Sequence, residues 1–129
     1  MPRTVLDASA VLAVLFREPG ADLIETHYAH AIVSSVNLSE VAAKLCDYGM
    51  GSAEVEEFLS GLGLDVRSFD EAQALAAGSL RKATRSRGLS LGDRACLALG
   101  IAEGVAVVTT DRNWSAVSRT VGVQVIVAR

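Results

Sequence analysis

Five short apolar runs alternate along the chain with longer segments whose apolar residues recur at helical spacing. Because parallel strands need crossover connections, which are usually helices, this alternation predicts an α/β fold with a mostly parallel sheet covered on both faces. Half of the residues are hydrophobic but only 5% are aromatic, which suits aliphatic helices packed closely on a sheet. The 129 residues contain no repeat or linker, so we expect one domain over residues 1–129. The expected strands cover residues 3–6, 31–34, 64–69, 105–109 and 123–127.

Helix signals fill the intervals between these runs. Gly49-Met50-Gly51 separates two helices, Gly88 ends a long helix, and Gly104 stops another before an apolar run. The expected helices cover residues 8–18, 21–30, 37–48, 52–62, 70–86 and 90–103.

The apolar run at residues 11–16 stops at Arg17, far short of the ~20 residues needed to cross a bilayer. We therefore expect no signal peptide, membrane anchor or membrane partner. Cys46 and Cys96 lie in apolar helical patterns without CxxC spacing or a nearby His. This predicts buried free thiols in a reducing compartment, and hence a cytoplasmic protein.

Acidic residues directly follow two of the expected strands. Asp7 comes after residues 3–6, and Asp111 comes shortly after residues 105–109. Ligands of open α/β sheets bind at the carboxyl ends of the strands, so both carboxylates are candidates for a shared site. Each also fits a plain role as a helix N-cap or turn residue. Asp70 occupies the same kind of position, and we interpret it as an N-cap alone.

Two more acids lie near the starts of expected helices. Glu40 is three residues after Asn37, and Asp93 is three residues after Ser90, the spacing at which an acid folds back on a cap. Capping and metal binding do not exclude each other, because a cap also holds a carboxylate near the sheet edge. Clustered carboxylates repel each other unless a hard divalent cation joins them. If all four acids converge, the chain is suited to metal-assisted phosphate chemistry.

Four short blocks around these acids resemble the signature blocks of PIN-domain nucleases, most closely the small bacterial PIN toxins of VapC type. Their order, their strand or helix context and the chain length agree, and the resemblance runs over essentially the whole chain. The blocks are Leu6-Asp7-Ala8-Ser9, Asn37-Leu38-Ser39-Glu40, Leu91-Gly92-Asp93-Arg94 and Thr109-Thr110-Asp111-Arg112-Asn113-Trp114.

The resemblance implies a PIN-like three-layer α/β sandwich with the strand order 3-2-1-4-5. It also implies a site for one or two Mg²⁺ ions, which Mn²⁺ can replace. Ser9, Thr109 and Asn113 would orient the ligands through hydrogen bonds, although the two hydroxyls also fit plain local capping. The implied metal ligands and catalytic residues are Asp7, Glu40, Asp93 and Asp111.

The implied activity is endoribonuclease hydrolysis of RNA by metal-activated water, leaving a 5′-phosphate and a 3′-hydroxyl. We expect no histidine base, because His27 and His30 lie in the expected second helix, away from the strand ends. In the resembling toxins a helical clip, here residues 52–62, binds a cognate antitoxin, and homodimers are usual. Plain core packing is the alternative for the apolar face of this segment.

The net charge of −3 does not exclude RNA, because setting the four candidate ligands aside leaves 11 acids against 12 bases. Four bases fall within seven residues, where they form either a solvated helix face or a phosphate-binding edge. Arg94 and Arg112 each adjoin a candidate ligand and would either contact the scissile phosphate or balance charge. The four clustered bases are Arg81, Lys82, Arg85 and Arg87.

Three other interpretations stay open. The first is a catalytically silent PIN module that binds RNA or a partner, and the second is a PIN nuclease of RNA processing without a toxin role. The third, a phosphotransfer protein, fits poorly because Ser9 stands where an Asp-x-Asp phosphatase needs its second Asp. A phospho-receiver would need a lysine at a strand end, whereas Lys44 and Lys82 lie inside expected helices.

Overall fold

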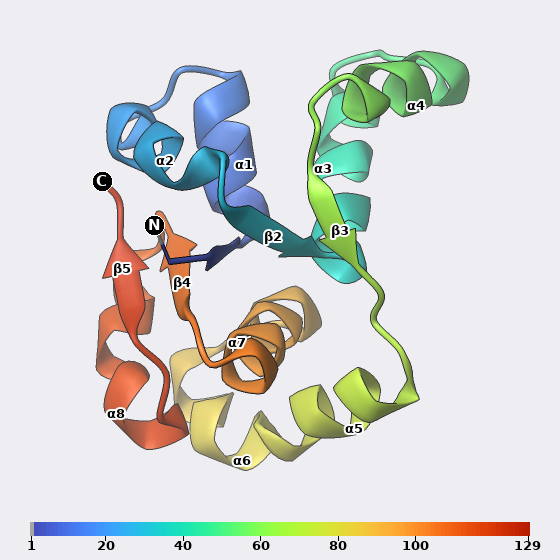
Figure 1. The fold of residues 1–129 in the computed structure, drawn as a ribbon. Helices are drawn as coiled ribbons and strands as arrows, with labels where there is room; N and C mark the ends of the chain where they lie inside the picture. Colours follow the sequence, from blue (N-terminus) through green and yellow to red (C-terminus); the bar gives the residue numbers. More distant parts are fainter. Residues whose placement is uncertain (1) are drawn as a thin grey trace.

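The computed structural model describes residues 2–129, and its five parallel strands stand in the order β3-β2-β1-β4-β5 (Figure 1). The predicted α/β class and strand order are confirmed. Leu6 at the end of β1 lies opposite Val108 in β4, so the carboxyl ends of these neighbouring strands are nearly level. The strands are β1 (Thr4–Leu6), β2 (Ala31–Ser34), β3 (Asp65–Arg67), β4 (Ala106–Thr109) and β5 (Val125–Val127).

Helices cover both faces of this sheet, with α1 to α4 on one side and α5 to α7 on the other (Figure 1). The α-helices are α1 (Ala8–Leu15), α2 (Ala21–Tyr28), α3 (Ser35–Asp47), α4 (Ser52–Ser60), α5 (Glu71–Ser79), α6 (Arg81–Thr84), α7 (Leu91–Glu103) and α8 (Ser118–Val121). Two short 3₁₀ helices are η1 (Arg85–Arg87) and η2 (Arg112–Ala116).

Successive residues of the central strands point to opposite faces and fill two separate cores. On β1, Val5 packs in the core under α7, whereas Leu6 packs in the core under α1 and α3. Ile32 and Val33 of β2 alternate in the same way. Burial on both faces explains why these strands read as unbroken apolar runs rather than as alternating patterns.

The helix predicted over residues 70–86 is instead three short helices, so this prediction is wrong in detail. The first of them, α5, ends at the Gly78-Ser79 pair, where the Ser79 hydroxyl donates to the Leu75 carbonyl (2.9 Å). Glycine–serine pairs and such back-bonding are common causes of helix kinks. Asp70 caps α5 by accepting from the Gln73 N–H, as predicted.

The two cysteines differ in exposure. Cys96 is buried as predicted, but Cys46 is exposed, so the prediction for Cys46 is wrong. Its side chain borders a surface groove beside α3 rather than the core. Within residues 2–129, no helix combines the length and the apolar character needed to cross a membrane.

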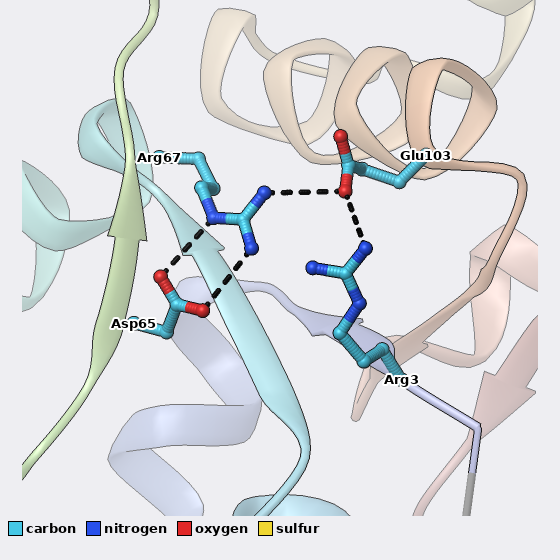
Figure 2. Close-up of polar contacts among 4 residues, drawn as sticks. All are labelled: Arg3, Asp65, Arg67 and Glu103. Atoms are coloured by element: carbon cyan, nitrogen blue, oxygen red, sulfur yellow. Dashed lines mark hydrogen bonds and ion pairs between the residues drawn. The ribbon is translucent and has the colours of Figure 1, made fainter.

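An ion-pair network ties the edge strand β3 to the end of α7 (Figure 2). Arg67 binds both carboxylate oxygens of Asp65 (3.1 Å each) and also Glu103 (3.2 Å). Arg3 reaches the same Glu103 oxygen at 3.0 Å. These side chains are partly exposed, so solvent screens each pair and the network contributes little to stability, although it does connect β3 with α7.

Candidate active site

Asp7 lies at the carboxyl end of β1 with only 4% of its surface exposed. It caps α1, because its Oδ1 accepts from the Ala10 N–H (2.8 Å), and the same oxygen accepts from Ser9 Oγ (2.7 Å). On the opposite side, Thr109 Oγ1 donates to Asp7 Oδ2 (2.6 Å). The cap that the sequence predicts therefore leaves the carboxylate fixed at the sheet edge.

Ser9 and Thr109 also link Asp7 to the loop that carries Asp111. Ser9 Oγ accepts from the Thr110 N–H (3.0 Å), and Thr109 Oγ1 accepts from the Asp111 N–H (3.1 Å). Each hydroxyl has one proton, and both protons go to Asp7, so no hydrogen occupies the 3.3 Å contact between the two hydroxyls. Both residues make the contact with Asp7 that their predicted orienting role requires.

Burial raises the pKa of Asp7 from 3.8 to about 6. The hydrogen bonds from Thr109, Ser9 and Ala10 lower this pKa, and the negative charge of Asp93 raises it further, but desolvation is the largest effect. In the absence of a cation, the ionised carboxylate thus costs about 3 kcal/mol of folding free energy at neutral pH.

Asp93 lies at the third position of α7 and forms the predicted capping box with Ser90. The Ser90 N–H donates to Asp93 Oδ2 (2.9 Å), and the Asp93 N–H donates to Ser90 Oγ (3.3 Å). Desolvation raises the pKa of Asp93, and the charge of Asp111 raises it further. Asp111 itself is exposed, and its Oδ1 accepts from the Asn113 N–H (2.9 Å).

Glu40 lies on α3, but it does not take part in the capping pattern predicted for it. The N-cap of α3 is Ser34, not Asn37, so Glu40 lies in the second turn and the capping prediction for it is wrong. Ser34 ends β2 and enters α3 without a loop, which is why the helix begins earlier than the sequence suggests. Asn37 Nδ2 nevertheless donates to Glu40 Oε1 (2.8 Å) and also to the Gly92 carbonyl (3.1 Å).

The acids of the separate blocks are linked by the effects of their charges on nearby pKa values. The charge of Asp93 raises the pKa of Asp7, and that of Asp111 raises the pKa of Asp93. Burial first, and then the charges of Asp7, Asp93 and Glu40, raise the pKa of the Cys96 thiol, which lies in the core below. The charges of Asp7, Asp93 and Asp111 thus affect one another, and the convergence of all four acids on one metal site stays a prediction.

The model of the PIN domain family matches residues 4–120. The chain belongs to the PIN domain family. No protein of curated function matches it significantly.

Solved structures with the same fold as this PIN domain include three toxin–antitoxin assemblies. A DNA-bound VapBC from Salmonella typhimurium aligns at a TM-score of 0.73 with 16% identity over 100% of both chains. A toxin–antitoxin complex from Klebsiella pneumoniae gives 0.70 with 15% identity over 98% of both chains. VapBC-5 from Mycobacterium tuberculosis gives 0.67 with 19% identity over 98% of this chain and 99% of the other. At these identities the likeness shows a shared fold.

The donor chemistry of the acidic region in this PIN domain fits a hard divalent cation. Carboxylate oxygens are the preferred ligands of Mg²⁺ and Mn²⁺, and the buried Asp7 carboxyl meets only neutral hydrogen-bond donors among the described residues. Across residues 2–129, however, no three His, Cys, Asp or Glu side chains are close enough to form a ready-made metal site. The described acids do not surround a single point closely enough to bind one ion as they stand, so their role as ligands stays a prediction.

The remaining predicted residues lie in α6, η1, α7 and η2. The side chain of Asn113 donates from Nδ2 to the Arg87 carbonyl (2.7 Å), while its backbone N–H donates to Asp111. It thereby joins η2, next to Asp111, to the basic segment. Arg94 donates from Nη1 to the Ala77 carbonyl (3.1 Å) and so ties α7 to α5. The exposed basic residues are Arg81, Lys82, Arg85, Arg87 and Arg112.

Sequence reasoning did not assign Gly92 any role and assigned Asn37 only a cap. Asn37 is 1% exposed, and its Oδ1 is buried without a hydrogen-bond partner in the described part of the chain. Leaving such an acceptor unpaired costs about 1–3 kcal/mol, so burial of the Asn37 amide lowers the stability of the fold. The available signals were a glycine directly before Asp93 and a polar residue between Val36 and Leu38.

Proposed function

We propose that this PIN domain is a divalent-metal-dependent endoribonuclease. The observation that carries the proposal is the buried Asp7 carboxylate at the carboxyl end of β1, which two hydroxyls hold and whose pKa the charge of Asp93 raises. Membership of the PIN domain family favours phosphodiester hydrolysis over the phosphotransfer alternative.

The four acids share one role in the proposed reaction. Asp7, Glu40, Asp93 and Asp111 would hold a Mg²⁺ or Mn²⁺ ion, which would supply charge neutralisation at the phosphate and activation of the attacking water. Asp7, fixed by Ser9 and Thr109, is the best-oriented ligand, because neither carboxylate oxygen is free to rotate away. In the capping box, the Ser90 N–H likewise fixes the direction of the Asp93 carboxylate by donating to its Oδ2. His27 lies on α2, and His30, predicted in the same helix, lies in the turn that follows it; the proposed mechanism uses no imidazole base.

The deciding test is cleavage of end-labelled total RNA by the purified protein with Mn²⁺ or Mg²⁺, beside an EDTA sample and the Asp93→Asn variant. We expect discrete products that EDTA abolishes and that Asp93→Asn reduces by roughly 10²–10³-fold, the order of loss when a charge-stabilising group is removed. Asparagine can still accept from the Ser90 N–H, so the variant should fold. Intact RNA with the wild-type protein would favour a silent binding module instead.

We infer that the basic segment of α6 and η1 guides RNA to the acids, because Asn113 holds Arg87 beside the Asp111 loop. Replacing Arg85 and Arg87 by Gln is expected to weaken RNA binding and to reduce the slope of log K against log salt by roughly 0.7 per residue. Fluorescence anisotropy with labelled single-stranded RNA measures both quantities. Arg17→Gln is the control, since Arg17 lies at the far end of α1 from Asp7 and pairs with Glu25. Equal slopes for all three proteins would refute the guiding role.

We further propose that the chain is the toxin of a toxin–antitoxin pair, supported by the toxin–antitoxin assemblies among its structural neighbours. A groove of about 610 Å³ between α3, α4 and β3 offers an apolar surface of the kind that holds a partner helix. The cleavage assay also tests this proposal. If a small gene beside this one encodes the antitoxin, its protein product, purified together with this chain, should inhibit RNA cleavage. The main apolar lining residues are Leu38, Ala42, Val55, Leu59, Leu64 and Val66.

A further inference from the structure

Glu40 differs from the other three acids in how it is held. Asp7, Asp93 and Asp111 each accept a backbone N–H near their own helix start. Glu40 lies in the second turn of α3 and is exposed, and the hydrogen bond that it accepts among the described residues comes from Asn37 Nδ2. A long, exposed side chain has many rotamers, so something other than its own helix must set its direction.

Gly92 supplies the space into which the Glu40 carboxylate fits. A Cβ built on Gly92 would lie 2.5 Å from Glu40 Cδ and 2.7 Å from Glu40 Oε2, closer than real Cβ atoms approach other atoms. Gly92 occupies the second position of α7, directly before Asp93, and has an ordinary helical backbone. Glycine is therefore not needed there for its conformation, but its missing side chain lets Glu40 lie against α7.

Asn37 closes the other side of this space. Its Nδ2 lies between two acceptors, Glu40 Oε1 and the Gly92 carbonyl, so the amide orientation is fixed: a flipped amide would place oxygen against oxygen. The amide thus bridges α3 and α7, the two helices that carry Glu40 and Asp93. The fold keeps this bridge even though Asn37 Oδ1 is buried without a hydrogen-bond partner among the described residues.

We propose that Gly92 and Asn37 are positioning residues, which together seat the Glu40 carboxylate against α7 so that it joins Asp93 in binding the divalent cation. The inference rests on the proposed metal site but not on RNA being the substrate. Because the Glu40 carboxylate is the free end of a flexible side chain, an added methyl group at position 92 displaces it without disturbing the backbone.

Gly92→Ala tests this seat, with Gly78→Ala as the matched control. Gly78 also lies in a helix, and a Cβ added there meets no described atom within 4 Å. Alanine favours helix over glycine, so both variants should unfold at the same or a higher temperature than wild type. Calorimetric titration with Mn²⁺ alone should show an affinity reduced roughly 10–100-fold in Gly92→Ala and unchanged in Gly78→Ala.

Asn37→Ala and Glu40→Gln complete the experiment. If Gly92 acts through Glu40, adding Gly92→Ala to Glu40→Gln should cause no further loss of Mn²⁺ affinity, and Asn37→Ala should weaken binding in the same direction as Gly92→Ala. Wild-type Mn²⁺ affinity in Gly92→Ala, a further loss in the double variant, or no Mn²⁺ binding by the wild type would each overturn the inference. Mn²⁺ binding that depends on Gly92 in a protein that cleaves no RNA would uphold the seat and refute the proposed nuclease.

Discussion

Asp7→Asn is expected to abolish RNA cleavage and at the same time to make the metal-free protein more stable at neutral pH, by up to about 3 kcal/mol. The carboxylate is buried, and its pKa of about 6 means that the folded protein must hold a charge in a poorly solvated place above that pH. Asparagine removes the charge but keeps the shape. A gain in stability with a loss of function is the expected signature of a buried ligand that awaits a cation.

The hydrogen bonds around Asp7 can accommodate the amide. Its oxygen can accept from the Ala10 N–H and from Ser9, while its NH₂ group can donate to Thr109 after that hydroxyl rotates its proton away. The cap on α1 therefore survives the substitution. Cleavage should fall by roughly 10²–10³-fold or more, because the substitution removes a charge from the centre of the site.

The pH dependence identifies the cause of the stability gain. A raised folded-state pKa makes Asp7 release its proton later in the folded than in the unfolded protein, so wild-type stability falls as pH rises from about 3.8 through about 6. Urea unfolding in EDTA should show little difference between wild type and Asp7→Asn at pH 4 and the full difference at pH 8. Asp70→Asn, at an exposed N-cap, is the control. A difference that does not vary with pH would show that burial of the charge is not the cause.

Local chemistry explains which parts of the fold were predictable from the sequence. Ser90 and Asp93 lie three residues apart, and both partners of their capping box are visible in a short stretch of chain. The doubly buried strands likewise appear as apolar runs, because both faces of the sheet are covered. The order of the strands is not local, and it followed from the resemblance of the acidic blocks to a known family.

The features that escaped prediction depend on contacts between distant segments. Ser34 and Asn37 are both good N-caps, and only the end of β2 decides that α3 starts at Ser34. The amide of Asn37 reaches Gly92, 55 residues away, so its role depends on how α3 meets α7. Cys46 fits an apolar helical pattern, but the groove beside α3 leaves it exposed. A pattern of hydrophobicity cannot distinguish a core from a surface groove.

Trp114→Ala is expected to destabilise the protein by about 3–5 kcal/mol, the cost of emptying a large buried aromatic site. Trp114 is fully buried and packs with Leu97 and Val117 in the core under α7, while its backbone N–H, which alanine would keep, donates to the Asp111 carbonyl (3.2 Å). This loss is a large part of the 5–15 kcal/mol free energy of unfolding of a typical domain. The variant should therefore unfold at a much lower urea concentration than wild type, which circular dichroism measures.

Trp114→Phe separates the packing of the ring from its polar atom. The indole Nε1 is buried and has no hydrogen-bond partner in the described residues, so phenylalanine removes an unpaired donor while keeping most of the aromatic volume. We expect Trp114→Phe to cost less than about half of what Trp114→Ala costs, since only the volume difference is lost. Equal losses would mean that Nε1 contributes a bond, for example to a buried water. Because Trp114 lies three residues after Asp111, the packing of its ring also holds the loop that carries Asp111.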